Sequence, residues 1–145
     1  MPTRTARTEW SGGLTDGSGT TELSSSGLGS FDVSFPKRAA DEANGFTSPE
    51  ELVAAAHSAC YAMQLSAMLV EAGGRPERLE VTAEVSLGPD PAGGFRIPSI
   101  TLRVRGSVPG LDAEAFVQAA EAAKTACPVS KALTGTEITL DAAVA

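Results

Sequence analysis

The chain has 145 residues, 42% of them hydrophobic, and a formal net charge of -7 at pH 7. This length suffices for one hydrophobic core but not for two ordinary domains, so a single domain over residues 1–145 is predicted. The acidic balance, with no local run of Lys or Arg, argues against nucleic acid and membrane surfaces as partners. Neither a signal peptide nor a spanning helix is predicted, so we expect a cytoplasmic protein.

The N-terminal segment, residues 1–46, is rich in Gly, Ser and Thr and is divided by turn formers such as Gly12-Gly13 and Asp16-Gly17. β-Branched and aromatic residues stand between these turns, which is typical of short strands. The pattern predicts strands near residues 3–10, 19–24 and 30–35.

The strongest local signal is a helix that follows this segment. Ser48 can cap it, Pro49 fits its first turn, Glu51 stands where a capping box needs an acid, and Gly73 and Gly74 end it. Between these ends lie roughly six turns dense in Ala, Leu and Met with almost no charge. Most of the circumference of this helix is therefore expected to be buried.

The remaining chain predicts a hairpin, a broken helix and a final strand. The hairpin strands are expected at 79–87 and 95–108, with a long turn-rich tip. A helix capped by Asp112 runs toward Lys124, and Pro128 interrupts it, so a short new helix starts at Cys127 and runs to Leu133. The last strand is predicted at 137–144. This order of elements is typical of an α+β fold.

The chain has only two cysteines, far apart in sequence. Two are too few for a disulfide scaffold, and their spacing is unlike that of a zinc site. Cys60 lies in the middle of the apolar helix, where a cysteine is normally inert. Cys127 lies at a predicted helix N-terminus, where free backbone amides favour the thiolate, so it is expected to have the lower pKa. Inert buried thiols remain an alternative interpretation of both.

Three further side chains are candidates, each with a structural alternative. Arg38 follows the third predicted strand, where the default is an exposed cation, and Glu50 is a first-turn carboxylate of the kind that complements a helix dipole. His57 is the only histidine and precedes Cys60 by three positions, so the two share a helix face. A metal site of His57, Cys60 and Cys127 is one alternative, and a hydrogen-bonded core histidine is another.

Two strings make the sequence recognisable: TSPEELVAAAHSACYAMQLSAMLVEAG and, later, AKTACPVSKALTGTEITLD. Together they closely resemble the OsmC/Ohr family of organic hydroperoxide reductases. The resemblance spans nearly the whole chain, including WSGGLTDGSGT, VSFPKR and VPGLD. It implies an α+β, OsmC/Ohr-like fold of order β-β-β-α-β-β-α-(α)-β, as an intertwined homodimer with central buried helices between two sheets.

The resemblance also implies a chemistry that needs no metal or organic cofactor. Cys60 would attack an organic hydroperoxide and become a sulfenic acid, and Cys127 would condense with it to a disulfide that a cellular thiol or dithiol reduces. The family's charged helpers correspond to Arg38 and Glu50, with Lys37 as a possible substitute for Arg38. A guanidinium stabilises a thiolate, and a carboxylate can hold that guanidinium in place.

The spacing of Glu50 and Cys60 bears on how such a site is built. They are ten positions apart on one predicted helix, which separates them by roughly 15 Å along its axis. A sharp bend or a second subunit would be needed to bring them together. The apolar helix favours the second option, so composite sites at a dimer interface are expected.

The substrate preference is expected to come from apolar residues near Cys60. Met63, Leu65 and Phe46 are candidates for lining a pocket that favours alkyl hydroperoxides over hydrogen peroxide. The main alternative is a protein of the same fold that binds a hydrophobic ligand without turnover.

Overall fold

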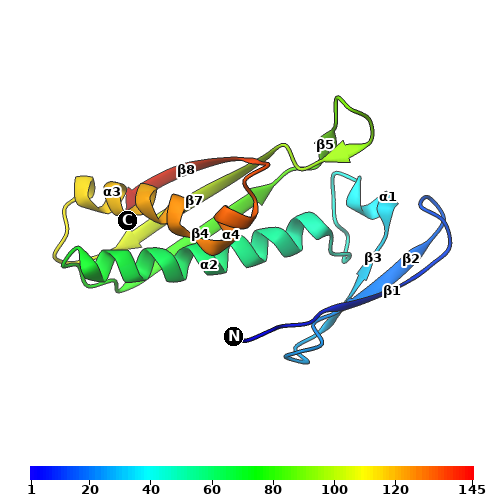
Figure 1. Cartoon of the computed structure of the whole chain (residues 1–145), viewed down its shortest axis with the longest axis horizontal. Coiled ribbons are helices and arrows are strands. Elements are labelled where there is room, and N and C mark those ends of the chain that lie inside the picture. Colours follow the sequence, from blue (N-terminus) through cyan, green and yellow to red (C-terminus); the bar gives the residue numbers. More distant parts are fainter. The chain divides into compact units, whose positions relative to one another are not determined.

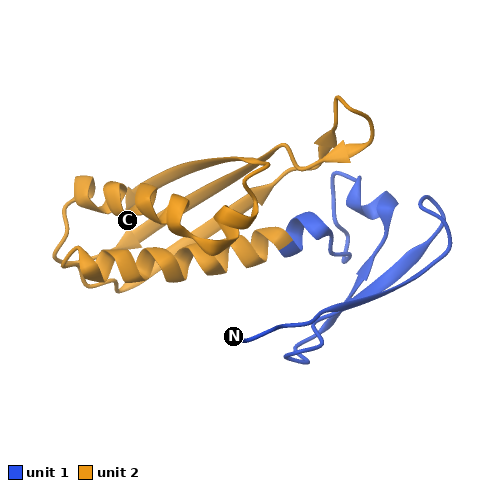
Figure 2. Ribbon diagram, viewed as in Figure 1, with its two compact units in different colours: residues 1–52 blue, residues 53–145 orange.

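The structure is a computed structural model that describes residues 1–145. The chain divides into two compact units, residues 1–52 and 53–145 (Figure 2). Helix α2 (Pro49–Glu71) begins in the first unit and continues through the second. The single-domain interpretation of the sequence therefore stays a prediction.

The first unit contains a three-stranded antiparallel sheet in the order β1-β2-β3 (Figure 1). Its strands are β1 (Arg7–Ser11), β2 (Ser18–Glu22) and β3 (Ser30–Val33). The predicted third strand is too long, because a short helix, α1 (Phe35–Arg38), begins directly after it. Ser34 caps α1 by accepting a hydrogen bond from the Lys37 amide, and a proline fits its first turn.

The predicted boundaries of α2 are confirmed at both ends. The Ser48 hydroxyl accepts a hydrogen bond from the Glu51 amide at 3.2 Å. The Glu51 carboxylate does not return a capping-box bond, because it accepts from the Thr47 hydroxyl at 2.7 Å instead. After Glu71 the chain turns at Gly73, whose φ of 91° favours glycine.

Only one side of α2 is buried within the chain. His57, Tyr61, Leu65 and Leu69 are each 0% exposed and recur at every fourth position, so they form one stripe along the helix. On other sides Met63 is 73% exposed. The expectation that most of the circumference is buried is therefore wrong for a single chain.

The hydropathy of α2 corrects a second expectation. By length and composition alone the helix could cross a membrane, with a mean hydropathy of 1.3, although no such helix was predicted. A core helix of a soluble protein meets the same criterion.

The second unit is built on a mixed sheet in the order β4-β7-β8. Antiparallel pairing joins β4 (Arg78–Val85) to β7 (Ser99–Ser107), and parallel pairing joins β7 to β8 (Glu137–Val144). The last strand has the predicted bounds, whereas the predicted hairpin strand 95–108 is interrupted. Its beginning forms a separate small ribbon of β5 (Gly88–Pro89) and β6 (Phe95–Arg96) at the hairpin tip.

The core of the second unit lies where α2 and α3 (Ala113–Ala126) pack on the sheet (Figure 1). Tyr61, Leu102 and Phe116 belong to this core and are 0% exposed. Gly106 of β7 lets the Phe116 ring approach the strand, since a Cβ there would stand 2.7 Å from the ring. The Asp112 side chain caps α3 at 2.8 Å as predicted, and α4 (Pro128–Ala132) follows the predicted break.

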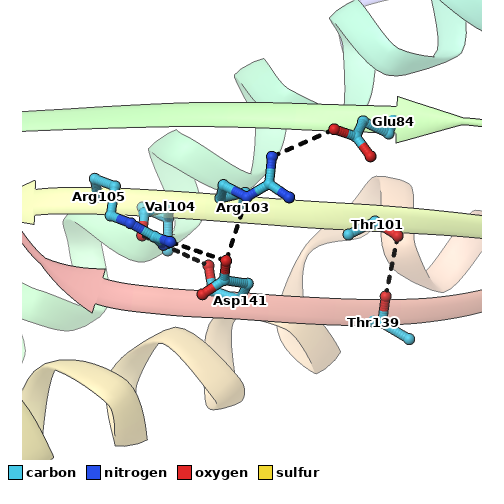
Figure 3. Close-up of polar contacts among 7 residues, drawn as sticks. All are labelled: Glu84, Thr101, Arg103, Val104, Arg105, Thr139 and Asp141. Carbon is cyan, nitrogen blue, oxygen red and sulfur yellow. Dashed lines mark hydrogen bonds and ion pairs between the residues drawn. The ribbon is translucent and has the colours of Figure 1, made fainter.

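The opposite face of this sheet carries exposed ion pairs and hydroxyl groups (Figure 3). Asp141 of β8 pairs with Arg103 at 3.2 Å and with Arg105 at 2.8 Å, and Arg103 also reaches Glu84 at 3.3 Å. All of these side chains are 40% or more exposed. Such pairs add little stability, so the helix-covered face holds the sheet in place.

Candidate active site

Cys60 is positioned by α2 at the border of its buried stripe. It adjoins the fully buried Tyr61 and is itself half-buried, packed against the core of the second unit. The Tyr61 hydroxyl donates to the carbonyl oxygen of Ala120 at 2.9 Å, which ties α2 to α3 beside the cysteine. Cys60 thus lies on a rigid, packed element.

Cys127 is positioned by the break between α3 and α4. Its extended ψ of 124° ends α3, where its N–H donates to the carbonyl oxygen of Ala123 at 2.9 Å. The same residue precedes Pro128, which has no N–H and starts α4. Cys127 is 0% exposed and belongs to the core cluster against which Cys60 packs. The helix break at the proline therefore falls beside a residue whose thiol is buried in this core.

The two thiols are neighbours in the second unit although 67 positions separate them (127 minus 60). Both are free, and each shifts the pKa of the other through a side-chain interaction. A pair of adjacent thiols can close a disulfide once one of them is oxidised. The structure thus brings together the two predicted cysteines.

The pKa values of the two thiols shift in opposite directions. Burial raises the pKa of Cys60, the Val129 amide opposes this, and Cys127 raises it further, so that the net pKa is above its ordinary value. For Cys127 burial also acts upward, but hydrogen bonds from the Ser130 amide, Cys60, the Ser130 hydroxyl and the Val129 amide outweigh it and lower the pKa. The Cys127 side chain accepts no hydrogen bond of standard capping geometry at the start of α4. The expectation that Cys127 has the lower pKa agrees with these directions.

His57 pairs with a residue that the sequence did not nominate. Its Nε2 lies 2.7 Å from Oγ of Ser130, and both side chains are buried. The core-histidine interpretation is therefore confirmed. The sequence contains a weak signal for Ser130. It stands three positions after Cys127, and the residue at this place in a first helical turn commonly contacts the side chain of the residue that caps the helix. No group of three or more His, Cys, Asp or Glu side chains is arranged to hold a metal ion.

Arg38 and Glu50 form the second pair of candidate residues, in the first unit. Arg38 Nη2 donates to Glu50 Oε1 at 2.7 Å, and its Nε lies 3.1 Å from both carboxylate oxygens. The Glu50 side chain is 9% exposed and that of Arg38 is 31% exposed. A two-point contact of this kind fixes the plane of the guanidinium. Lys37 does not share it, since its Nζ lies over the Phe46 ring at 5.8 Å.

An apolar hollow of about 320 Å³ adjoins this ion pair in the first unit. Its lining includes Arg38 together with the apolar residues Trp10, Leu14, Val33, Phe35, Pro49 and Leu52. The expected pocket residues do not line it. Leu65 is fully buried in the core of the second unit, so its predicted role is wrong, and Met63 is exposed. Phe46 lies against Lys37 and lines a separate, mainly polar hollow of the first unit.

Comparison with known proteins identifies the family of this chain. The model of the family described as OsmC-like protein matches residues 41–142. The chain belongs to the OsmC-like family. It is 44% identical over 132 residues to peroxiredoxin OsmC of Escherichia coli K12, a match that covers 91% of this chain and 90% of that protein. The Shigella flexneri peroxiredoxin OsmC matches equally.

Solved structures agree with this OsmC-like assignment. An organic hydroperoxide resistance protein from Elizabethkingia anophelis superposes with a TM-score of 0.79 at 28% identity, over 100% of this chain and 98% of that one. Organic hydroperoxide resistance protein OhrB of Bacillus subtilis gives a TM-score of 0.74 at 31% identity, over 95% and 97%. The predicted family and its α+β fold are thus confirmed.

Proposed function

We propose that this protein is a thiol peroxidase that reduces organic hydroperoxides to alcohols, and hydrogen peroxide less well. The observation that carries the proposal is the pair of free, adjacent thiols with unequal pKa values, in a chain 44% identical to a peroxiredoxin. No organic cofactor is required, because sulfur itself supplies the redox chemistry. In the cytoplasm such an activity protects against oxidative stress.

The reaction has two steps that involve the chain's own atoms. The Cys60 thiolate attacks the terminal oxygen of ROOH, the O–O bond breaks, and the alkoxide takes a proton to leave as the alcohol. Cys60 is then a sulfenic acid, which the Cys127 thiolate attacks at sulfur. The S–O bond breaks, hydroxide takes a proton to become water, and a Cys60–Cys127 disulfide forms. A cellular thiol or dithiol returns both residues to thiols.

Arg38 supplies the charge that the first step needs. The immediate surroundings of Cys60 raise its pKa, so its thiolate requires stabilisation from a further group. The Arg38 guanidinium, held by Glu50, is suited to stabilise both the thiolate and the negative charge that develops on the leaving oxygen. We place Lys37 outside this role because of its contact with Phe46.

The active unit is a homodimer in which Arg38 and Glu50 of one chain serve Cys60 of the other. Support comes from the helical rise of roughly 15 Å between Glu50 and Cys60 within α2. It also comes from the apolar side chains that α2 leaves uncovered in one chain, with Met63 73% and Val70 59% exposed. A second copy of the helix is the partner that such a surface fits.

Mixing impaired variants tests the composite site. Alone, Arg38→Ala chains are expected to turn over roughly 10- to 100-fold more slowly than wild type, and Cys60→Ser chains not at all. After subunit exchange at equal amounts, half of the dimers are mixed, and each mixed dimer contains one site with both native residues. About a quarter of wild-type turnover should return if the site is shared between chains. No recovery after verified exchange would place the whole site within one chain.

A peroxide-consumption assay tests the activity itself. With a dithiol reductant, cumene hydroperoxide should be consumed faster than hydrogen peroxide, and Cys60→Ser should abolish both reactions. The apolar hollow near Arg38 favours one competing function, the binding of a hydrophobic ligand without turnover. Retention of cumyl alcohol without any peroxide consumption would support that alternative and contradict the peroxidase.

A further inference from the structure

Ser130 stands between the only histidine and Cys127. Its Oγ lies 2.7 Å from His57 Nε2 in a site where His57 is 0% and Ser130 7% exposed. The Ser130 hydroxyl also acts on Cys127, whose pKa it lowers against the raising effect of burial. One hydroxyl group thus pairs with an imidazole on α2 and lowers the pKa of the thiol at the start of α4, all within the second unit.

The number of hydrogens decides the direction of these bonds. A serine hydroxyl has one hydrogen, and a hydroxyl that favours a thiolate directs this hydrogen at the sulfur. Its oxygen must then accept from His57, so the imidazole proton is on Nε2. Nδ1 is left as a bare lone pair, and it is the one buried side-chain polar atom with no partner in the chain. The opposite tautomer would bury an unpaired N–H donor there instead.

We propose that His57 and Ser130 are positioning residues that form a neutral hydrogen-bond relay, His57 Nε2–H to Ser130 Oγ and Ser130 Oγ–H to Cys127 Sγ, which holds Cys127 as the attacking thiolate in disulfide formation. The relay rests on the proposed function, because it prepares the second step. When Cys127 attacks the Cys60 sulfenic acid, its charge passes to the departing hydroxide, which takes a proton to become water. The relay donates no proton in this step. Its hydroxyl orients the sulfur and stabilises its charge beforehand.

Burial keeps the relay neutral. Desolvation lowers the pKa of His57, so the imidazole stays uncharged at neutral pH and donates through one N–H. A charged imidazolium would bring a second N–H, at Nδ1, into a site with no acceptor for it. The relay is therefore expected to hold the same form across the physiological pH range.

Other titratable groups around Cys127 do not take over this role. On α2, Cys60 interacts with it directly, and burial raises the pKa of Tyr61 above its ordinary value, with the nearby charges of Glu121 and Cys127 adding to the shift, so this phenol stays neutral. On α3, Lys124 pairs with Glu121 at 2.9 Å. The remaining charged groups of α3, α4 and β8 are Glu114, Lys131, Glu137 and Asp141, all exposed.

The first test reads the tautomer directly. Because His57 is the only histidine, a protein labelled with ¹⁵N-histidine gives one imidazole signal set. The reduced protein should show the Nε2–H tautomer, with no protonation near pH 7. An Nδ1–H tautomer, or an imidazolium at neutral pH, would overturn the relay.

The second test measures the thiolate of Cys127. In a Cys60→Ser background, the rate of iodoacetamide alkylation of Cys127 is followed against pH. Ser130→Ala should move the midpoint upward by about one pH unit. His57→Leu should move it in the same direction by less, and His57→Gln, which keeps a donor near the Nε2 position, should restore most of it. Ser58→Ala removes a neighbouring α2 hydroxyl that donates to the Ala55 carbonyl oxygen at 3.2 Å, and it should leave the midpoint unchanged.

These results are separable from the peroxidase assay. Unmoved midpoints in Ser130→Ala and His57→Leu would overturn the relay even if peroxide turnover proceeds as proposed. Shifted midpoints in a protein that consumes no peroxide would leave the relay standing and contradict the function. Should His57→Leu fail to fold by circular dichroism, Ser130→Ala and the histidine tautomer decide the matter.

Discussion

Strand β7 presents two faces of opposite chemistry in alternate residues. Leu102 and Val104 are 0% exposed beneath the helices, whereas Arg103, between them, points to the outer face and is 45% exposed at its side chain. The outer face carries three ion pairs, and the inner face carries the core that includes Cys127. The exposed polar network is therefore expected to contribute little to stability, and the buried core that includes Cys127 to contribute most.

Adjacent substitutions on β7 provide the sharpest test of this contrast. Leu102→Ala should lower the free energy of unfolding by about 2–5 kcal/mol, because it leaves a cavity in the core. Arg103→Ala removes two exposed ion pairs and should cost about 0.2–1 kcal/mol. Urea denaturation monitored by circular dichroism measures both. Equal losses would mean that the outer network contributes as much as the core.

A partly buried arginine and an exposed one should likewise differ in their effect on peroxide turnover. Arg38→Ala should reduce peroxide turnover roughly 10- to 100-fold, since a charge-assisted hydrogen bond contributes about 1.5–3 kcal/mol. Arg103→Ala, which removes an arginine of the outer face, is the matched control and should keep wild-type turnover. Steady-state rates with cumene hydroperoxide at equal folded concentration measure the difference. Wild-type turnover in Arg38→Ala would remove this residue from the site.

A buried hydroxyl and an exposed one should differ in the same way. Tyr61→Phe removes the hydrogen bond to the Ala120 carbonyl oxygen and should cost about 1 kcal/mol of unfolding free energy. The control is Thr139→Val on the outer face, where the lost contact is the hydroxyl pair with Thr101 at 3.2 Å. A change near zero is expected for it. A larger loss at Thr139 than at Tyr61 would reverse the comparison.

A small, pH-dependent effect on stability is expected at Asp141. Its hydrogen bond to Arg105 holds the pKa of the carboxyl below its ordinary value; desolvation opposes this shift, and the hydrogen bond to Arg103 adds to it. A depressed folded pKa stabilises the protein above the unfolded pKa and loses this effect as the pH falls through the folded pKa. Asp141→Asn should thus cost a little stability at pH 7 and nothing in strong acid, and added salt should shrink the difference. A loss that persists in acid would require another cause.

Local sequence signals predicted the parts of the fold that depend on local chemistry. The start of α2 at Pro49, the break at Pro128 and the strand Glu137–Val144 follow from caps, a missing N–H and alternation. Helix α1 was missed because its capping residue, Ser34, lies inside a pattern that reads as strand. One-sided burial of α2 could not be derived, since apolar composition does not reveal whether the cover comes from the same chain.

The candidate site shows the same difference between residues that local sequence signals reveal and residues that only tertiary packing brings together. Cys60 and Cys127 were found from their positions and from the family strings, and Arg38 with Glu50 from the strings alone. The Ser130 partner of His57 was missed, because 73 positions separate the two residues and only tertiary packing brings them together. The pocket prediction failed at Leu65 for a related reason, since an apolar side chain on a helix can face the core as readily as a substrate.

The order of attack by the two thiols is the central claim, and it runs against the local pKa directions, which favour Cys127. Single mutants treated with one equivalent of cumene hydroperoxide and a sulfenic-acid trap, then analysed by mass spectrometry, test it directly. Cys127→Ser should accumulate trapped sulfenic acid on Cys60, whereas Cys60→Ser should leave Cys127 as a thiol at the same short time. Rapid peroxide consumption by Cys60→Ser, with the trap on Cys127, would show that the two roles are reversed.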